Sequence, residues 1–313
     1  MSEQEPTLGE TEGTTREGAA ATPGRATTVV AWDGSASSRA ALLWAIERER
    51  AAPGRLLLVT VLDEAYRGCG PAAMAELSLS AGHAIEAEVD WIRATEPGLP
   101  VSMLLLEGDP DDVILAQCVP GSMLVLGRQE RRSPLQRWSR AAQLASRAPV
   151  PVAVVPIEEP PTQVQVVVSG RSGVLVGVDG SPASVQACLT AAAEAHRRQE
   201  TLHIVHAGPA PDPARETDVG AESRAMVDDC ARAALHAHPS LTVSQRFVPG
   251  PAAPVLLRLA QNKALLVIGS RGRGAVAGFL LGSVSRALVA NATGPLIVVT
   301  EMPAAPDPDT GDA

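Results

Sequence analysis

An internal repeat constrains the fold of this chain more than any other feature of its sequence. Residues 28–35 read TVVAWDGS and residues 174–181 read VLVGVDGS, so both halves carry an apolar run that ends in Asp-Gly-Ser before an alanine-rich segment. Three further pairs of segments match in the same order: 55–60 with 201–206, 122–127 with 264–269, and 151–155 with 295–299. Four matches in one order indicate a duplicated domain.

Within each copy, short apolar runs alternate with longer segments of helical pattern. In the second copy this pattern predicts strands near 173–178, 201–207, 242–248, 264–269 and 295–300, and helices near 182–198, 216–237, 252–261 and 283–291. The apolar runs lack strict alternation with polar residues, which is typical of parallel strands buried on both faces. The predicted fold class is therefore α/β: two tandem doubly wound (Rossmann-like) domains, each a five-stranded, mainly parallel sheet with helices on both faces.

The length of 313 residues suits two domains, each of about 150 residues. We predict a first domain at 27–156 and a second at 173–301, joined by a proline-rich linker at 157–172. Residues 1–26 and 302–313 are rich in Gly, Pro, Thr, Asp and Glu. We expect both tails to be disordered, because they have little apolar surface to bury.

Composition argues against several classes of protein. Apolar residues make up 45% of the chain, but no run approaches the roughly 20 apolar residues of a membrane span. The first residues are acidic and polar, without the basic and apolar regions of a signal peptide, so we expect a cytoplasmic protein with no membrane partner. The formal net charge of −9 argues against nucleic acid as a partner, because binding to a phosphate backbone needs a basic face.

The four cysteines, Cys69, Cys118, Cys188 and Cys230, are scattered and form no Cys-x-x-Cys pair. Each lies among apolar residues or in a helical pattern, so we expect four buried, reduced thiols. The six histidines show no metal-ligand spacing either. The sequence therefore predicts no protein-borne metal site.

A glycine-rich segment in the second copy carries the clearest functional signal. The predicted strand that ends at 269 runs into Gly-Ser-Arg-Gly at 269–272, and nine residues later comes Gly-Ser-Val-Ser at 282–285. Glycines let a backbone approach a ligand closely, and successive N–H groups together with a helix N-terminus form a concave anion site. The serines of the second segment add hydroxyl donors, and Arg271 and Arg273 add positive charge.

Asp179 is predicted to share a crevice with this segment. In a doubly wound sheet, ligands lie beyond the carboxyl ends of the strands, where the winding reverses. If the first and fourth strands are neighbours there, Asp179 can accept hydrogen bonds from a base or a sugar while the glycine-rich segment holds phosphates. A lone Gly-x-x-Gly favours an ordinary turn, but the full Gly-x2-Gly-x9-Gly-Ser pattern is much more specific.

The repeat, the Asp-Gly-Ser strand end and the glycine pattern together resemble the universal stress protein family, specifically its ATP-binding, tandem-domain members of actinobacterial type. The resemblance covers nearly the whole chain apart from the tails. It implies ATP as the ligand and a role in stress adaptation or dormancy through bound nucleotide; the metal that accompanies ATP, Mg²⁺ for instance, is left open. The binding residues that it implies are Gly177, Asp179, Ala207, Gly269, Ser270, Arg271, Gly272, Arg273, Gly274, Ala275, Gly282, Ser283, Val284 and Ser285.

The first copy departs from this pattern at its phosphate loop. Glu130 replaces the second glycine, Trp138 replaces the third, and the loop is two residues shorter. A carboxylate and an indole should repel or block ATP, which predicts one ATP site in each chain. Asp33 remains, and its expected role is structural: its carboxylate accepts N–H hydrogen bonds at the strand-to-helix turn.

Five arginines lie on or beside this altered loop: Arg128, Arg131, Arg132, Arg137 and Arg140. A solvated basic loop is the default interpretation. A salvaged anion site and a docking surface for an acidic partner are the alternatives.

No catalytic constellation is visible in the chain: the sequence has no serine nucleophile elbow, no His-Glu-x-x-His and no paired catalytic carboxylates. We expect a regulatory ATP-binding protein rather than an enzyme, with at most slow ATP hydrolysis or self-phosphorylation. An interaction scaffold with ATP as a structural ligand is an alternative that the sequence does not separate from this one. Gly272-x-Gly274-x-x-Ala277 also fits the dinucleotide fingerprint of an oxidoreductase, but it follows the fourth predicted strand instead of the first.

The last strand of each copy, at Val152–Val155 and Leu296–Val299, is expected to be an exposed sheet edge. Unpaired edges invite pairing with another strand, and the family resemblance implies strand pairing of this kind. We expect the two halves to associate within the chain. A homodimer of whole chains and a regulatory protein partner are further candidates, and the partner is unknown.

Overall fold

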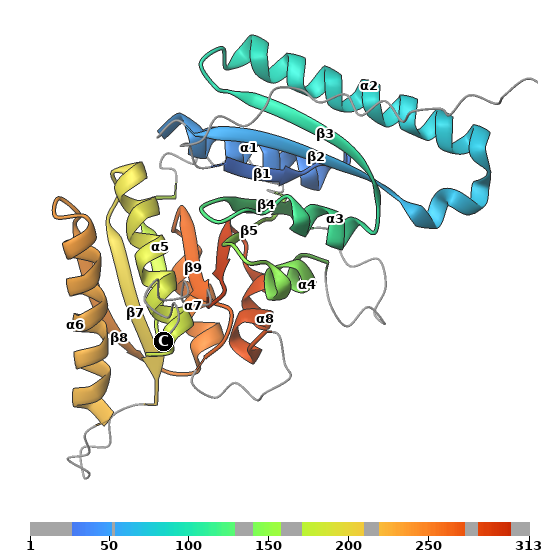
Figure 1. Ribbon diagram of the computed structural model, residues 1–313. Coiled ribbons are helices and arrows are strands. Elements are labelled where there is room, and N and C mark those ends of the chain that lie inside the picture. The colour runs from blue at the N-terminus through green and yellow to red at the C-terminus, as the bar shows by residue number, and fades with distance from the viewer. Residues whose placement is uncertain are drawn as a thin grey trace, which may run out of the picture.

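The structure is a computed structural model and describes residues 27–51, 54–128, 140–157, 171–209, 219–272 and 281–301 (Figure 1). The first half contains β1 (Thr27–Ala31), α1 (Ala36–Ala51), β2 (Arg55–Asp63), the 3-10 helix η1 (Glu64–Cys69), α2 (Pro71–Thr95), β3 (Val101–Gly108), α3 (Pro110–Ala116), β4 (Met123–Gly127), α4 (Arg140–Arg147) and β5 (Val152–Val155). The second half contains β6 (Val174–Gly177), α5 (Pro182–Arg198), β7 (Leu202–Gly208), α6 (Val219–Ala237), β8 (Val243–Pro249), α7 (Ala252–Ala260), β9 (Leu265–Gly269), α8 (Ser283–Asn291) and β10 (Leu296–Val299).

The strands and helices predicted for the second half are all confirmed. Their ends agree with the structure to within one residue, which is the usual uncertainty of such boundaries. The start of α6 is the exception, because it adjoins residues 210–218, which lie outside the described ranges. The predicted tails and most of the predicted linker also lie outside them.

One ten-stranded sheet runs through the molecule in the order β3-β2-β1-β4-β5-β10-β9-β6-β7-β8. Within each half the neighbouring strands are parallel, and β1 lies beside β4 as β6 lies beside β9, so the predicted neighbours at the winding reversal are confirmed. The halves join where β5 and β10 pair antiparallel, which confirms the predicted pairing within the chain. The two five-stranded sheets thus cover each other's open edge.

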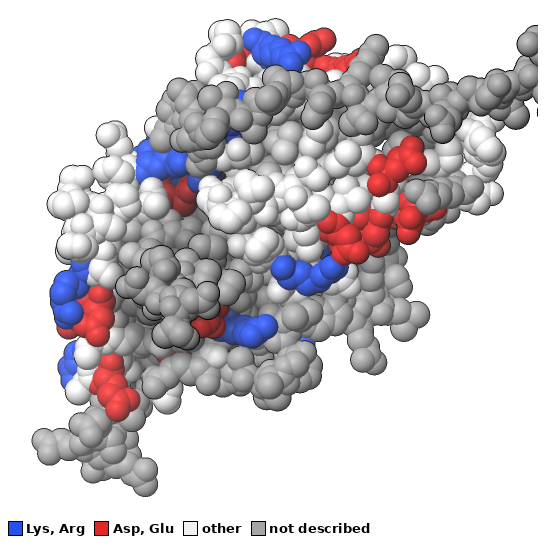
Figure 2. All heavy atoms as spheres, viewed as in Figure 1, with Lys and Arg blue, Asp and Glu red and all other residues white. Residues whose placement is uncertain are grey.

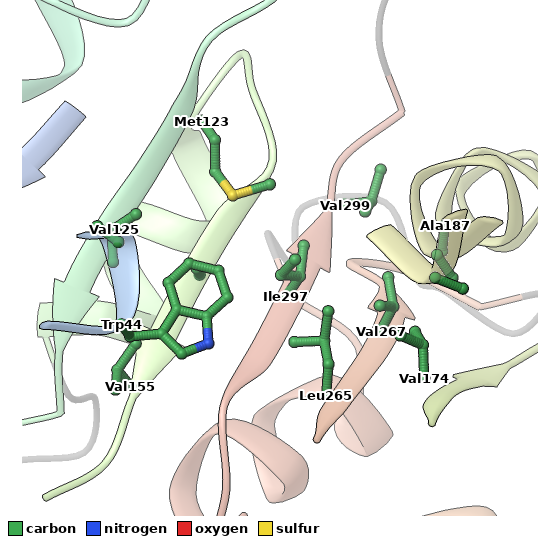
Figure 3. Close-up of a cluster of buried hydrophobic side chains, with 14 of the residues drawn as sticks. Trp44, Met123, Val125, Val155, Val174, Ala187, Leu265, Val267, Ile297 and Val299 are labelled. Carbon is green, nitrogen blue, oxygen red and sulfur yellow. The ribbon is translucent and has the colours of Figure 1, made fainter. Parts of the chain in front are cut away.

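Helices cover both faces of this sheet. Two buried apolar clusters, one on each face, draw residues from both halves: the first involves α1, α2, α5 and α6, and the second involves α3, α4, α7 and α8. Figure 3 shows part of the first cluster, in which Trp44 of the first half approaches Ile297 of the second half. The apolar core therefore continues across the junction between the halves.

A pseudo-two-fold axis relates the two halves. It passes between Ala153 and Ile297, which occupy equivalent positions in the repeat and face each other across the β5–β10 pair. Arg48 and Glu194 meet across the same axis on the face of α1 and α5, and each is the thirteenth residue of its helix. Nη2 and Nε of Arg48 donate to Oε1 of Glu194 at 2.6 and 3.0 Å, and the two residues are 7% and 2% exposed.

On the opposite face of the sheet, two more contacts cross the junction at the C-terminal ends of α4 and α8. The hydroxyl of Thr300 donates to the carbonyl oxygen of Ala148 at 2.9 Å. Nη1 of Arg128 donates to the carbonyl oxygen of Ala292, the position equivalent to Ala148. Each half thus supplies a donor for the end of the other half's last helix.

The cysteine prediction is confirmed for three residues and wrong for the fourth. Cys118, Cys188 and Cys230 are buried, and burial raises the pKa of Cys118 to about 11. Cys69 is exposed, because it ends η1 in the connection between β2 and α2, and connections run over the surface. Among the described residues, no group of three or more His, Cys, Asp and Glu could hold a metal ion, and no described helix has the length and hydropathy to cross a membrane.

Candidate functional site

The turn between β6 and α5 fixes the carboxylate of Asp179 at the end of the sheet. Gly180 has a φ of 78°, a conformation that favours glycine. Ser181 caps α5 by accepting a hydrogen bond from the N–H of Ser184 at 3.2 Å. The N–H and the hydroxyl of Ser181 both donate to Oδ1 of Asp179, at 3.0 and 2.6 Å. One carboxylate oxygen of Asp179 thus holds the turn.

The other oxygen of Asp179 lies against the glycine-rich segment after β9. A Cβ atom at position 272 would lie 2.4 Å from Oδ2 of Asp179, so any other residue there would displace this carboxylate. A Cβ atom at Gly269 would lie 2.9 Å from the backbone of α5. The hydroxyl oxygen of Ser181 lies 3.1 Å from the carbonyl oxygen of Arg271, which connects the two turns. Glycines at 269 and 272 therefore let the ends of β6 and β9 meet.

The N-terminus of α8 closes the same end of the sheet. Its N-cap is Gly282, which has no side chain to accept hydrogen bonds from the first N–H groups of the helix. The N–H of Gly282 donates to the carbonyl of Ser270 at 2.9 Å, and the hydroxyl of Ser285 donates to the carbonyl of Gly269 at 2.8 Å. These bonds hold the first turn of α8 over the end of β9. A helix N-terminus of this kind attracts anions.

A cavity of about 460 Å³ lies between these segments, a volume in the usual range for small-molecule sites. Asp179, Arg271 and the first turn of α8 form its polar side. Its apolar side is formed by Val178, Val205, Leu256, Ile268 and Leu281. The arrangement suits a ligand that has an apolar ring at one end and an anionic group at the other.

Ten of the predicted site residues line this cavity: Gly177, Asp179, Ala207, Gly269, Arg271, Gly272, Gly282, Ser283, Val284 and Ser285. Ser270 does not line it, because it is 2% exposed and its N–H donates to the carbonyl of Val299 at 2.7 Å. Its place is in the scaffold that holds the glycine-rich segment. Arg273, Gly274 and Ala275 lie outside the described residues.

One wall of the cavity comes from α7, which sequence reasoning missed. Ala252 and Leu256 lie one helical turn apart and both line the cavity, as does Arg286 of α8. A Cβ atom at Gly177 would lie 2.7 Å from Cδ1 of Leu256, so glycine lets α7 pack against the end of β6. The spacing of Ala252 and Leu256 marks one face of a helix, but it does not indicate which strand ends that face covers.

The first half has a smaller cavity, of about 250 Å³, at the equivalent place. Trp32 lines it at the position that corresponds to Val178, and the indole belongs to the buried cluster of α1 and α2. Sequence reasoning attributed the loss of the site to Glu130 and Trp138. Both lie outside the described residues, so that obstruction stays a prediction.

Asp33 has the structural role that the sequence predicts. Its Oδ1 accepts a hydrogen bond from the N–H of Ser35 at 3.0 Å, as Oδ1 of Asp179 does from Ser181. Burial acts to raise the pKa of Asp33, but hydrogen bonds from Ser35 and Ser38 outweigh it and hold the pKa below its usual value. The carboxylate is therefore kept ionised to serve the turn.

Two of the five arginines near the first cavity are described, and both make contacts within the chain. Arg128 is half-buried, burial lowers its pKa, and its guanidinium bonds to the carbonyl of Ala292. The interpretation as part of a solvated basic loop is therefore wrong for Arg128, because its guanidinium reaches across the junction. Nε of Arg140 donates to Oδ1 of Asp111 at 2.6 Å. The other three arginines lie outside the described residues.

The distribution of charge on the visible surface agrees with the net negative charge of the sequence. On the face shown in Figure 2, Lys and Arg side chains are scattered among Asp and Glu, and the described residues form no broad basic patch there.

Comparison with known proteins shows which family has this architecture. The family model described as "Universal stress protein family" matches residues 25–156 and again residues 171–300. A universal stress protein of Mycolicibacterium smegmatis is 29% identical over 292 residues, which cover 87% of this chain and 96% of that protein. A universal stress protein of Mycobacterium tuberculosis is 36% identical over 154 residues, and this match spans about half of that relative's length (49%) and 42% of this chain.

A solved structure shows the same fold. The crystal structure of a universal stress protein from Archaeoglobus fulgidus DSM 4304 matches 88% of this chain and 96% of its own, with a TM-score of 0.66 and 19% identity.

Proposed function

Because the chain belongs to the universal stress protein family, we propose that it is a nucleotide-dependent regulator that binds one ATP in its second half. The curated relatives are named for stress, and the proposed role is in stress adaptation or dormancy.

The meeting of Gly272 with Asp179 carries this proposal. A Cβ atom at 272 would lie 2.4 Å from Oδ2 of the carboxylate, so glycine at this position lets the carboxylate lie against the segment after β9. The contact brings a carboxylate, backbone N–H groups and the N-terminus of α8 to one rim of the 460 Å³ cavity. A hydrogen-bond acceptor beside an anion-binding helix end fits a ribose linked to phosphates.

Different walls of the cavity suit different parts of ATP. Val205, Leu256 and Ile268 form an apolar slot for the adenine ring. Asp179 stands between this slot and α8, where it can accept a hydrogen bond from a ribose hydroxyl. The first N–H groups of α8 and the side chain of Arg271 would hold the negative charge that the triphosphate supplies, with or without Mg²⁺.

We propose that binding, not turnover, is the function of this site. Among the described residues that line the cavity, one is a carboxylate, Asp179, and its Oδ1 already accepts two hydrogen bonds from Ser181. A group engaged in this way is suited to holding a ligand. Any hydrolysis of ATP is expected to be slow beside its binding and release.

Calorimetric titration tests the proposal. We expect one ATP bound per chain, because the first half lacks the room and the second half has it. Saturation at one hundred times the dissociation constant should stabilise the chain by roughly 2.7 kcal/mol, seen as a raised melting temperature. Binding of two equivalent ATP molecules, or of none, would overturn the proposal.

A further inference from the structure

The junction between the halves is built from unlike residues at equivalent positions. On the pseudo-two-fold axis, Ala153 of β5 faces Ile297 of β10. Beside them, the guanidinium of Arg48 meets the carboxylate of Glu194 at 2.6 Å. The two members of each pair occupy equivalent positions in the repeat, yet they differ in size in the first pair and in charge in the second. The junction is therefore pseudo-symmetric in its backbone and asymmetric in its side chains.

Charges around the axis are shared between the halves. Nη1 of Arg48 donates to Oε1 of Glu49 at 2.6 Å and to the hydroxyl of Thr28 at 3.0 Å, both within the first half. The remaining donors of Arg48, Nε and Nη2, bond to Glu194 of the second half. Arg197 adds a second cation, 3.9 Å from Oε2 of Glu49 and 4.0 Å from Oε1 of Glu194. Arg48 thus uses one side of its guanidinium for each half.

Side-chain volumes at the junction are also complementary. The first half presents the large Trp44 and the small Ala153, whereas the second half has the small Thr190 and the large Ile297 at the equivalent positions. Trp44 is 7% exposed and Ile297 is fully buried. Figure 3 shows the indole of Trp44 reaching toward Ile297. The large Ile297 thus lies opposite the small Ala153, and Trp44 of the first half reaches toward the same residue.

Two-fold symmetry gives these differences a consequence. When two identical surfaces pair about an axis, each residue on the axis meets its own copy. Two first halves would place Arg48 against Arg48, and the donors that serve Glu194 would face a second guanidinium. Two second halves would place Glu194 against Glu194 and Ile297 against Ile297. Like charges brought together in a buried interface and overpacked side chains both disfavour association.

We propose that this junction is a recognition surface whose partner is the unlike half, and that Arg48–Glu194 and Ala153–Ile297 exclude pairing between like halves of different chains. An open β5 or β10 edge is a general template for association. The unlike residues on the axis direct each edge to the other half of the same chain. The proposal goes beyond nucleotide binding, because it concerns how the duplicated chain chooses its own partner.

Co-expression of complementary charge reversals tests this recognition. A tagged chain that carries Arg48→Glu is produced together with an untagged chain that carries Glu194→Arg. Neither chain has the native ion pair within itself. The second half of the tagged chain keeps Glu194 and the first half of the untagged chain keeps Arg48, so one native junction can form between the chains. Mass spectrometry of the material held by the tag measures the amount of untagged chain, and light scattering measures the size of the complex.

We expect the untagged chain to co-purify more than about tenfold above the level seen with two wild-type chains, which corresponds to ~1.4 kcal/mol. Tagged and untagged chains that both carry Arg48→Glu should not reach this level. Arg50→Glu is the matched control: Arg50 lies on the same helix, pairs with Glu96 of its own half and has a side chain that is 60% exposed. This control should stay at the wild-type level.

Two outcomes overturn the proposal. In the first, the complementary pair co-purifies only at the wild-type level. In the second, two chains that both carry Arg48→Glu co-purify as strongly as the complementary pair does. If the single variants do not fold, the double variant Arg48→Glu with Glu194→Arg in one chain decides instead. It should melt above both single variants. A melting temperature at or below that of the weaker single variant shows that the two positions do not recognise each other.

Discussion

The two halves have the same strands and helices, yet the cavities at the ends of their sheets differ in size and lining. The second-half cavity measures about 460 Å³ and the first-half cavity about 250 Å³. Trp32 stands where the second half has Val178, and Ala141 stands where it has Ser285. The halves thus differ in a few residues at the carboxyl ends of the strands, whereas both have the elements that pack the core.

This difference separates two roles of a duplicated domain: packing at the junction between the halves and ligand binding at the strand ends. The strands of the first half remain because β5 covers the edge of β10 and both apolar clusters cross the junction. Residues of the loops beyond the strand ends, such as Trp32 and Leu281, also belong to these clusters. We expect the first half to serve mainly as a packing partner, and the second half to provide the ligand-binding cavity as well.

The largest effect on this comparison between the halves is expected from adding a side chain to the glycine-rich segment of the second half. Gly272→Glu should reduce ATP affinity by at least about a hundredfold, because its Cβ would meet Oδ2 of Asp179 and its carboxylate would oppose the phosphates. Titration calorimetry measures the loss. Gly98→Glu is the matched control, since nothing lies within 4 Å of a Cβ atom at that position. A folded Gly272→Glu chain that binds ATP like the wild type contradicts the location of the site.

Sequence reasoning succeeded where the signal is local and periodic. The elements of the second half follow from apolar runs and helix caps, and the spacing of glycines together with the family resemblance indicated the ten site residues that line the cavity. It failed where the answer depends on contacts between distant segments. Arg128 bonds to a carbonyl 164 positions away, and Leu256 forms a wall of the cavity only because α7 packs beside the end of β6. A single sequence carries no signal for such contacts.

Trp32 illustrates a different kind of failure. The repeat places it opposite Val178, but only the structure shows that it both lines the first-half cavity and packs in the cluster of α1 and α2. Ser270 differs from its neighbours in the glycine-rich segment, because it is buried and its N–H bonds to Val299 instead of lining the cavity. A motif thus identifies a segment more reliably than it identifies the side chains within the segment that face the ligand.

The two equivalent aspartates offer a test of intermediate size. Asp179→Ala should weaken ATP binding by about tenfold or more, because hydrogen bonds to a charged group contribute roughly 1.5–3 kcal/mol. Asp33→Ala should leave ATP affinity unchanged, because its cavity is not the proposed site. Both variants should melt at a lower temperature than the wild type, since each loses the carboxylate that holds a strand-to-helix turn. Equal losses of ATP affinity in the two variants would contradict the assignment of separate roles.

The smallest effect is expected at the junction, where the first half holds the C-terminal end of α8, the helix proposed to bind the phosphates. Arg128 donates to the carbonyl of Ala292 at the C-terminal end of α8, whose N-terminus lines the second-half cavity. Arg128→Met removes this bond and keeps an apolar stem. We expect ATP affinity to fall about threefold, or ~0.6 kcal/mol, because α8 loses a fixed point at one end.

Thr300 supplies the matched control, because it makes the equivalent contact in the opposite direction. Its hydroxyl donates to the carbonyl of Ala148 at the end of α4, which belongs to the first half. Thr300→Val should lower the melting temperature about as much as Arg128→Met does, since each variant removes one hydrogen bond across the junction. It should not change ATP affinity, because α4 lines only the first-half cavity among the described cavities. If both variants weaken ATP binding equally, the junction acts by general loosening, and the first half has no directed hold on the second half's site.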